Sequence, residues 1–145
     1  MRPEELYLTD IIEAADAIRR FLLDVEQNTF LRNELLQSAV LQKLMIIGEA
    51  ASRLPKEFSD RHPEIEWEDI IGFRNIAVHA YFAVEWSIVW VAATQEAPEL
   101  KRKITDILAK EYTSSQVTYY RLSFNPYASR LKILESRHAP YPLRF

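Results

Sequence analysis

The chain has 145 residues, of which 48% are hydrophobic and 27% are charged, and its formal net charge at pH 7 is -3. These values are typical of one soluble globular domain, and they disfavour a disordered chain and a protein that wraps broadly around nucleic acid. The chain contains no cysteine, which excludes disulfides, zinc-thiolate sites and thiol nucleophiles from the candidate chemistries.

The hydropathy of the chain predicts no membrane-spanning segment. Its longest strongly apolar run, from Trp86 to Ala93, is much shorter than the roughly 20 residues that a membrane-spanning helix needs. The first residues, Met1 to Glu5, show no secretory pattern. We therefore expect a cytoplasmic protein.

A first helix is predicted near the N-terminus. Its apolar residues recur every three or four positions, as on one face of an α-helix: Ile11, Ala15, Ile18, Leu22 and Val25. Asp10 and Glu13 have the spacing of a capping box, so we expect this helix to start near Asp10. The same periodicity elsewhere, with only two glycines in the chain, predicts an all-α protein.

A second helix is predicted from near Phe30 to Arg53, ending before Pro55, which cannot continue a helix. One face carries a continuous apolar row: Leu36, Val40, Leu44, Ile47, Ala51 and Leu54. A further apolar row lies beside it: Leu35, Ala39, Ile46 and Ala50. This surface is too wide for one core contact, so we expect another helix or a second copy of the chain to cover it. Gly48 would let another helix approach closely, or would serve tight packing within the chain.

Three more helices are predicted before residue 113. The third begins near Trp67 and continues into Arg74. The fourth is marked by Phe82, Trp86 and Trp90 at i, i+4 spacing. We interpret these aromatic rings as core rather than as a platform for RNA bases, because aliphatic residues surround them in the sequence.

The fifth helix begins near Pro98, a residue that is tolerated in the first turn. Its apolar positions have helical spacing: Leu100, Ile104, Ile107 and Leu108.

Charge is distributed unevenly along the chain. Residues 1–112 carry 13 basic and 20 acidic side chains, whereas residues 113–145 carry 5 and 1. We expect a helical domain over residues 1–112 and a basic C-terminal extension over residues 113–145. The extension is interpreted as a segment that docks on the body or on a partner, in preference to a nucleic-acid-binding arm.

The most informative segment runs from Arg74 to His79 and is followed by Tyr81. Arginine stays positively charged and offers a planar fork of donors to phosphate oxygens, and histidine can exchange protons near neutral pH. The pair is therefore suited to chemistry on a phosphate. Because this spacing is common by chance, the pair alone is a hypothesis.

The segment from Trp67 to Tyr81 reads WEDIIGFRNIAVHAY and resembles the signature of the HEPN superfamily, specifically the HepT-like toxins of HepT/MntA toxin-antitoxin modules. Ile46 to Ala51 and Phe82 to Trp90 are also similar to that family, so the resemblance covers roughly residues 8–112, whereas the extension has no counterpart. The resemblance implies an up-and-down bundle of about four or five helices. It also implies a homodimer, and a metal-independent endoribonuclease without a cofactor.

The resemblance further implies a role for each residue of the motif. His79 would be a general acid or base, and Arg74 would hold the phosphate of an RNA substrate, a transfer RNA or a message. Asn75 would orient that phosphate or His79 by hydrogen bonds. Tyr81 would be the residue to which an MntA-like nucleotidyltransferase antitoxin adds AMP, placing negative charge at the cleft.

Helix geometry limits how these groups can meet. Residues five apart are separated by about 140° on an ideal helix, so one straight helix would not aim Arg74 and His79 at one phosphate. Either the helix is distorted, or two chains share the site. Asn75 and His79 lie on one face, and a two-fold axis joining two such faces would build a composite cleft.

Two other functions stay open at this point. One is a non-catalytic HEPN module that binds a nucleotide or a partner protein. The other is an interaction partner that binds an acidic nucleotidyltransferase through its second helix and basic extension. A metal site at Asp60, His62, Glu64 and Glu66 is not expected, because a charged surface loop is usually just solvated.

Overall fold

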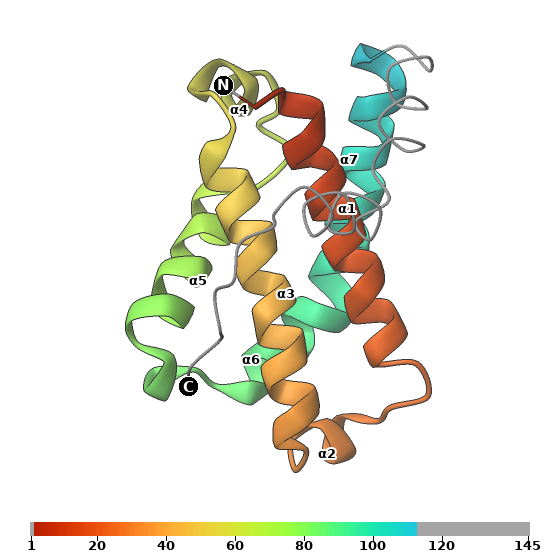
Figure 1. The fold of residues 1–145 in the computed structure, drawn as a ribbon, viewed down its shortest axis with the longest axis vertical. Coiled ribbons are helices and arrows are strands. Elements are labelled where there is room, and N and C mark those ends of the chain that lie inside the picture. Colours follow the sequence, from red (N-terminus) through yellow and green to blue (C-terminus); the bar gives the residue numbers. More distant parts are fainter. Residues whose placement is uncertain (1, 113–145) are drawn as a thin grey trace, which may run out of the picture.

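The computed structural model describes residues 2–112, and all regular structure within this range is helical (Figure 1). Four long helices alternate in direction: α1 (Glu4–Phe21), α3 (Glu34–Arg53), α5 (Trp67–His79) and α7 (Ala97–Glu111). Short helices connect them: α2 (Gln27–Phe30), α4 (Lys56–Arg61) and α6 (Trp86–Val91). The prediction of an all-α, up-and-down bundle is confirmed. The predicted extension, residues 113–145, lies outside the described residues.

Helix α3 is the central element of the bundle. It packs against α1 and α5, and α1 in turn packs against α7. Side chains from α1, α3 and α7 are completely buried between these helices: Leu8, Ile11, Val40 and Ile104. Their burial supplies the main driving force for folding. No helix among residues 2–112 is long and apolar enough to cross a bilayer.

Helix α1 begins six residues earlier than the capping-box prediction, which was wrong. It starts at Glu4 after Pro3, and Asp10 lies in its interior, where its carboxylate binds the guanidinium of Arg2 instead of capping the helix. The buried Leu8 extends the apolar stripe upstream. Two acidic residues in the first turn also favour the earlier start, because they interact favourably with the helix dipole.

The second predicted helix is divided in the structure. Phe30 belongs to the short helix α2, and α3 starts after Asn33, whose side-chain oxygen accepts a hydrogen bond of 3.0 Å from the Leu36 N–H. Asparagine is a favoured residue at this position because it satisfies a free backbone donor. The predicted end, at Arg53 before Pro55, is confirmed.

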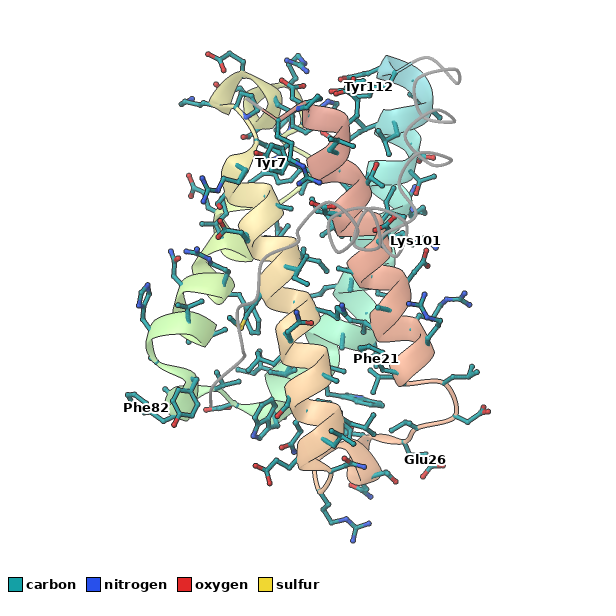
Figure 2. The ribbon with its side chains drawn as sticks, viewed as in Figure 1. Tyr7, Phe21, Glu26, Phe82, Lys101 and Tyr112 are labelled. Carbon is teal, nitrogen blue, oxygen red and sulfur yellow. The ribbon has the colours of Figure 1, made fainter. Side chains whose placement is uncertain are left out.

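Two of the three aromatic residues predicted for the core lie there. The ring of the completely buried Phe30 lies 6.4 Å from Trp86 and 5.4 Å from Trp90, between ring centroids. Phe82 instead lies in the 3₁₀ turn η1 (Tyr81–Ala83), is 82% exposed and projects away from the bundle (Figure 2). The prediction was wrong for Phe82, because the chain leaves the helical path after His79 and resumes it only at Trp86.

The fourth and fifth predicted helices follow each other in the structure without a break. Helix α6 passes directly into a π-helical turn, η2 (Ala92–Glu96), and then into α7. Pro98 at the start of α7 has no N–H to donate to the preceding turn and its ring crowds that turn. The π-helical turn lies just upstream of this proline.

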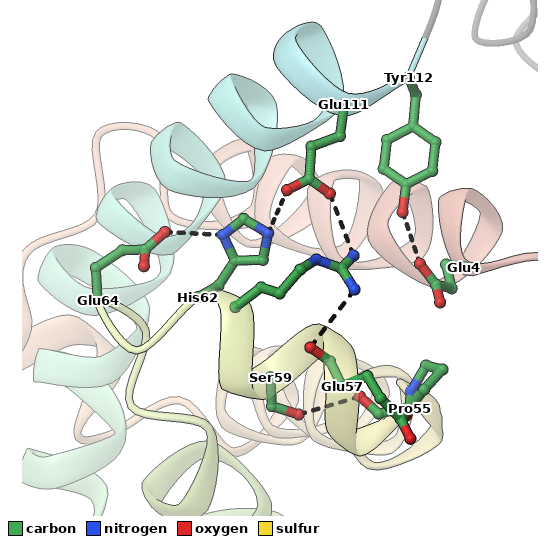
Figure 3. Close-up of polar contacts among 9 residues, drawn as sticks. Glu4, Pro55, Glu57, Ser59, His62, Glu64, Glu111 and Tyr112 are labelled. Carbon is green, nitrogen blue, oxygen red and sulfur yellow. Dashed lines mark hydrogen bonds and ion pairs between the residues drawn. The ribbon is translucent and has the colours of Figure 1, made fainter.

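Polar contacts fix the C-terminal end of α7 against α4 and α1 (Figure 3). His62 Nδ1 lies 3.1 Å from Glu64 Oε1, and Nε2 lies 2.7 Å from Glu111 Oε1, although it is not aligned for a hydrogen bond. The Tyr112 hydroxyl donates to Glu4 at 2.8 Å. Because the two carboxylates lie at different ring nitrogens of His62, they do not form a chelating set. No group of metal-binding character is found among residues 2–112.

Candidate active site on helix α5

Arg74, Asn75 and His79 lie on α5, whereas Tyr81 lies in the turn η1, and Arg74 is the one that lies where α5 crosses α3. At this crossing Gly48 faces Arg74 so closely that a Cβ atom on Gly48 would lie 2.3 Å from Arg74 Cβ and 2.9 Å from Arg74 Cγ. Real Cβ atoms do not approach other carbons so closely, so only glycine fits here without a shift. The helix that approaches Gly48 is α5 of the same chain, so the structure bears out the interpretation of this glycine as one that allows tight internal packing.

Two neighbours hold the guanidinium of Arg74. Its Nη2 binds Glu49 Oε2 from α3, and its Nη1 donates to Asn75 Oδ1 at 2.8 Å. The side chain of Arg74 is 28% exposed, so it is partly accessible to solvent. Arg74 and Asn75 are therefore brought together, and Arg74 is oriented before any ligand binds.

Glu49 is the residue that the sequence interpretation missed. Its other oxygen, Oε1, accepts from Arg53 at 2.9 Å, so one carboxylate joins two arginines. The hydrogen bond from Arg53, and then the charge of Arg74, hold the pKa of Glu49 below its usual value. The i, i+4 spacing of Glu49 and Arg53 was visible in the sequence, but nothing there indicated that Arg74 would join them.

His79 stands apart from this cluster. It is the last residue of α5 and is exposed, and within residues 2–112 no hydrogen bond or ion pair holds its imidazole. Helix α5 is regular from Trp67 to His79, so the distortion considered as one way to unite Arg74 with His79 does not occur. Asn75 accepts the hydrogen bond from Arg74 and, at i, i+4 spacing, shares a helical face with His79.

The surface around His79 is unusually apolar. Ile76 is 53% exposed and Val78 40% exposed on α5, and Tyr81 and Phe82 follow on the turn η1, with ring centroids 6.1 Å apart. Monomeric proteins seldom expose large apolar side chains in such a group. This end of α5 therefore has the apolar character of a contact surface, and the imidazole of His79 lies within it.

A separate hollow lies elsewhere in the described structure. It is a groove of about 320 Å³ between the start of α5, α6 and α7, whose floor includes Leu44, Ile70 and Phe73. Neither Arg74 nor His79 lines it. The polar lining of the groove consists of carboxylates and Lys103, and no histidine of the described residues lines it.

Comparison with known proteins identifies the family of this helical chain. The chain matches the family described as Ribonuclease HepT-like over residues 11–107, and it belongs to this family. The resemblance to the HepT-like members of the HEPN superfamily is thereby confirmed, and so is the expectation of an enzyme of the endoribonuclease class. The match ends before the predicted extension.

Relatives of known name support the same assignment. The chain is 37% identical over 102 residues to a protein of Thermococcus cleftensis named as a probable ribonuclease HepT, covering 70% of this chain and 93% of that one. It is 33% identical over 111 residues to a protein of Caldanaerobacter subterraneus subsp. tengcongensis, and 31% identical over 103 residues to one of Methanocaldococcus jannaschii, both provisionally named as RNases. These matches cover 77% and 71% of this chain, and 99% and 94% of the relatives. No solved structure matches significantly.

The crossing of α3 and α5 predicts opposite effects for the two glycines of the chain. Gly48→Ala should push Arg74 out of place, destabilising the protein by about 1–3 kcal/mol and lowering RNA cleavage by on the order of 10²-fold, as a misplacement of about 1 Å can do. Gly72→Ala, with nothing within 4 Å of the added Cβ, should stabilise the helix by roughly 0.5–1 kcal/mol. Urea unfolding and a cleavage assay measure both effects. Equal stability of the two variants would contradict the crowding at Gly48.

Proposed function

We propose that this protein is a cytoplasmic, metal-independent endoribonuclease toxin that cleaves RNA with Arg74, Asn75 and His79. The observation that carries the proposal is the orientation of the Arg74 guanidinium, which Glu49 and Asn75 hold before any substrate binds. The exposed imidazole of His79 lies at the end of the same helix. Orientation of charged donors before the substrate binds is a major source of catalytic power. Membership of the HepT-like family supports RNA as the substrate.

The reaction uses a nucleophile that the RNA itself supplies. A base removes the proton of the 2′-hydroxyl, the oxygen attacks the neighbouring phosphorus, and the bond from phosphorus to the 5′-oxygen breaks as that oxygen gains a proton. The products are a 2′,3′-cyclic phosphate and a 5′-hydroxyl. His79 exchanges protons in this sequence, a role worth typically 10²–10⁴-fold, and Arg74 stabilises the charge on the nonbridging oxygens.

Two chains build the complete site in this proposal. On one regular helix Arg74 and His79 point about 140° apart, so a single α5 does not direct both groups to one phosphate. A two-fold axis beside the exposed Ile76, which lies on the His79 side of α5, would bury apolar surface and bring His79 of one chain towards Arg74 of the other. The exposed Leu35 at the start of α3, which is 80% accessible, is a further apolar contact available to a second copy.

The first test of this function is cleavage without metal. Purified protein should cut single-stranded RNA in EDTA, leaving 2′,3′-cyclic phosphates that mass spectrometry identifies, and it should not cut DNA, which lacks the 2′-hydroxyl. His79→Ala should lower the rate by about 10²–10⁴-fold, and Arg74→Ala should also abolish most cleavage. Arg20→Ala, on the exposed face of α1, is the matched control. Cleavage that survives both substitutions, or that EDTA abolishes, would reject this mechanism.

A second test asks whether the site is shared between chains. Arg74→Ala and His79→Ala chains, unfolded together and refolded, should form mixed dimers in which one of the two sites has both functional groups. About a quarter of the wild-type activity should return, from half of the dimers with one working site each. Each variant refolded alone provides the baseline. If the mixture stays as inactive as its components, the two residues do not act across a dimer in this way.

Regulation of the toxin is part of the proposal. Tyr81 follows His79 by two residues, is 71% exposed and makes no side-chain hydrogen bond within the described residues, so its hydroxyl is accessible to a modifying enzyme. An MntA-like nucleotidyltransferase antitoxin would join this oxygen to the α-phosphorus of ATP and release pyrophosphate. The new phosphate would compete with RNA for Arg74, and the adenosine would occupy the cleft.

This regulation predicts a clear behaviour for Tyr81→Phe. The variant should still cleave RNA, because the tyrosine hydroxyl has no part in the reaction, but ATP and the cognate antitoxin should no longer silence it. Intact mass measurement should show added AMP on the wild-type chain and none on the variant. Tyr7→Phe, a partly buried tyrosine of α1, is the control. Silencing of Tyr81→Phe to the wild-type extent would assign the modification to another residue.

A further inference from the structure

Three charged side chains meet where the last turns of α3 lie beside the middle of α5. The carboxylate of Glu49 binds Arg74 through Oε2 and Arg53 through Oε1. Arg53 uses two of its nitrogens, Nε and Nη2, each 2.9 Å from that oxygen. The two guanidinium groups therefore enclose one small planar anion.

This arrangement has the features of an oxyanion site. Two arginines on one carboxylate leave a net charge of +1 within a domain that is acidic as a whole. A phosphate has more acceptor oxygens than a carboxylate and fits the guanidinium fork in the same bidentate manner. It can therefore replace Glu49 between the same two donors.

The cluster is also exposed to solvent, and separating its ion pairs costs little free energy. The side chains of Arg53, Glu49 and Arg74 are 63%, 40% and 28% exposed. Ion pairs at such exposure contribute little to stability, typically less than about 1 kcal/mol. Moving the Glu49 carboxylate aside therefore does not require the fold to change, and Gly48 keeps the backbones of α3 and α5 in place.

We propose that Arg53 and Arg74 form a phosphate-binding subsite for the RNA backbone, and that Glu49 occupies this subsite in the free protein. The inference rests on the proposed function, in which Arg74 binds the phosphate that is cleaved. Arg53 then binds an adjoining phosphate of the same strand. Glu49 is a positioning residue, which aligns both arginines and is displaced when the backbone enters.

The proposal makes opposite predictions for the cation and the anion of the cluster. Arg53→Ala removes one phosphate contact, so RNA affinity falls and the slope of log K against log salt becomes shallower by about 1. KM for cleavage rises while kcat changes little, as expected for uniform binding. Glu49→Gln removes the competing charge, so RNA binds more tightly, and the salt dependence becomes steeper.

The experiment measures binding without cleavage. Fluorescent single-stranded RNA with 2′-O-methyl groups, which cannot react, is titrated with the full chain at several salt concentrations and followed by anisotropy. Arg102→Ala is the matched control, because Arg102 is 59% exposed and is likewise held by two carboxylates, those of Glu99 and Asp106, but lies on α7. Circular dichroism melting establishes that each variant is folded.

The outcomes separate this inference from the proposed function. Suppose that the Arg53→Ala variant binds RNA with the same affinity and salt dependence as the Arg102→Ala control, while the wild-type chain cleaves RNA in EDTA. The subsite is then wrong and the proposed function stands. If Glu49→Gln binds RNA more weakly than the wild type, Glu49 only supports Arg74, and its role as an occupant of the site is overturned. If the wild-type chain binds this RNA with the predicted variant effects but cleaves no RNA, the subsite stands and the catalytic proposal fails. No binding by the wild-type chain overturns the subsite.

Discussion

The contact between α3 and α5 at Gly48 determines the geometry of everything around the motif. Because Gly48 has no side chain, α5 lies close enough for Arg74 to reach the carboxylate of Glu49. That ion pair orients the guanidinium, and Asn75 then receives its second hydrogen bond. A larger residue at position 48 would separate the helices and remove the common origin of these contacts.

Much of the fold could be predicted from apolar periodicity, because the bundle buries one stripe from each long helix. The stripe of α1 and the helix from Trp67 through Arg74 are both present as predicted. The start of α1 could not be found from capping chemistry, since Asp10 has a stronger partner in Arg2. Local patterns also could not show that Phe82 leaves the core, or that Pro98 is accommodated within one long rod.

The residues of the candidate site could likewise be predicted only in part. The motif residues were proposed from their chemistry, and the structure adds a hydrogen bond between Arg74 and Asn75 that the sequence did not predict. Glu49 lies 25 positions earlier in the sequence than Arg74, and a contact over that separation depends on how two helices cross rather than on any local pattern. The regularity of α5 through His79 likewise emerges only from the three-dimensional structure, and it favours a site that two chains share.

The ion pairs of Glu49 with two arginines also affect which anions can bind to those arginines. A tethered carboxylate competes at an effective concentration on the order of millimolar or more, so free phosphate and mononucleotides, which form few contacts, gain little by replacing it. A polymer that engages both arginines at once, and further groups along its length, can overcome that competitor. The carboxylate of Glu49 thus reduces the binding of abundant small anions, whereas a long RNA strand can still displace it.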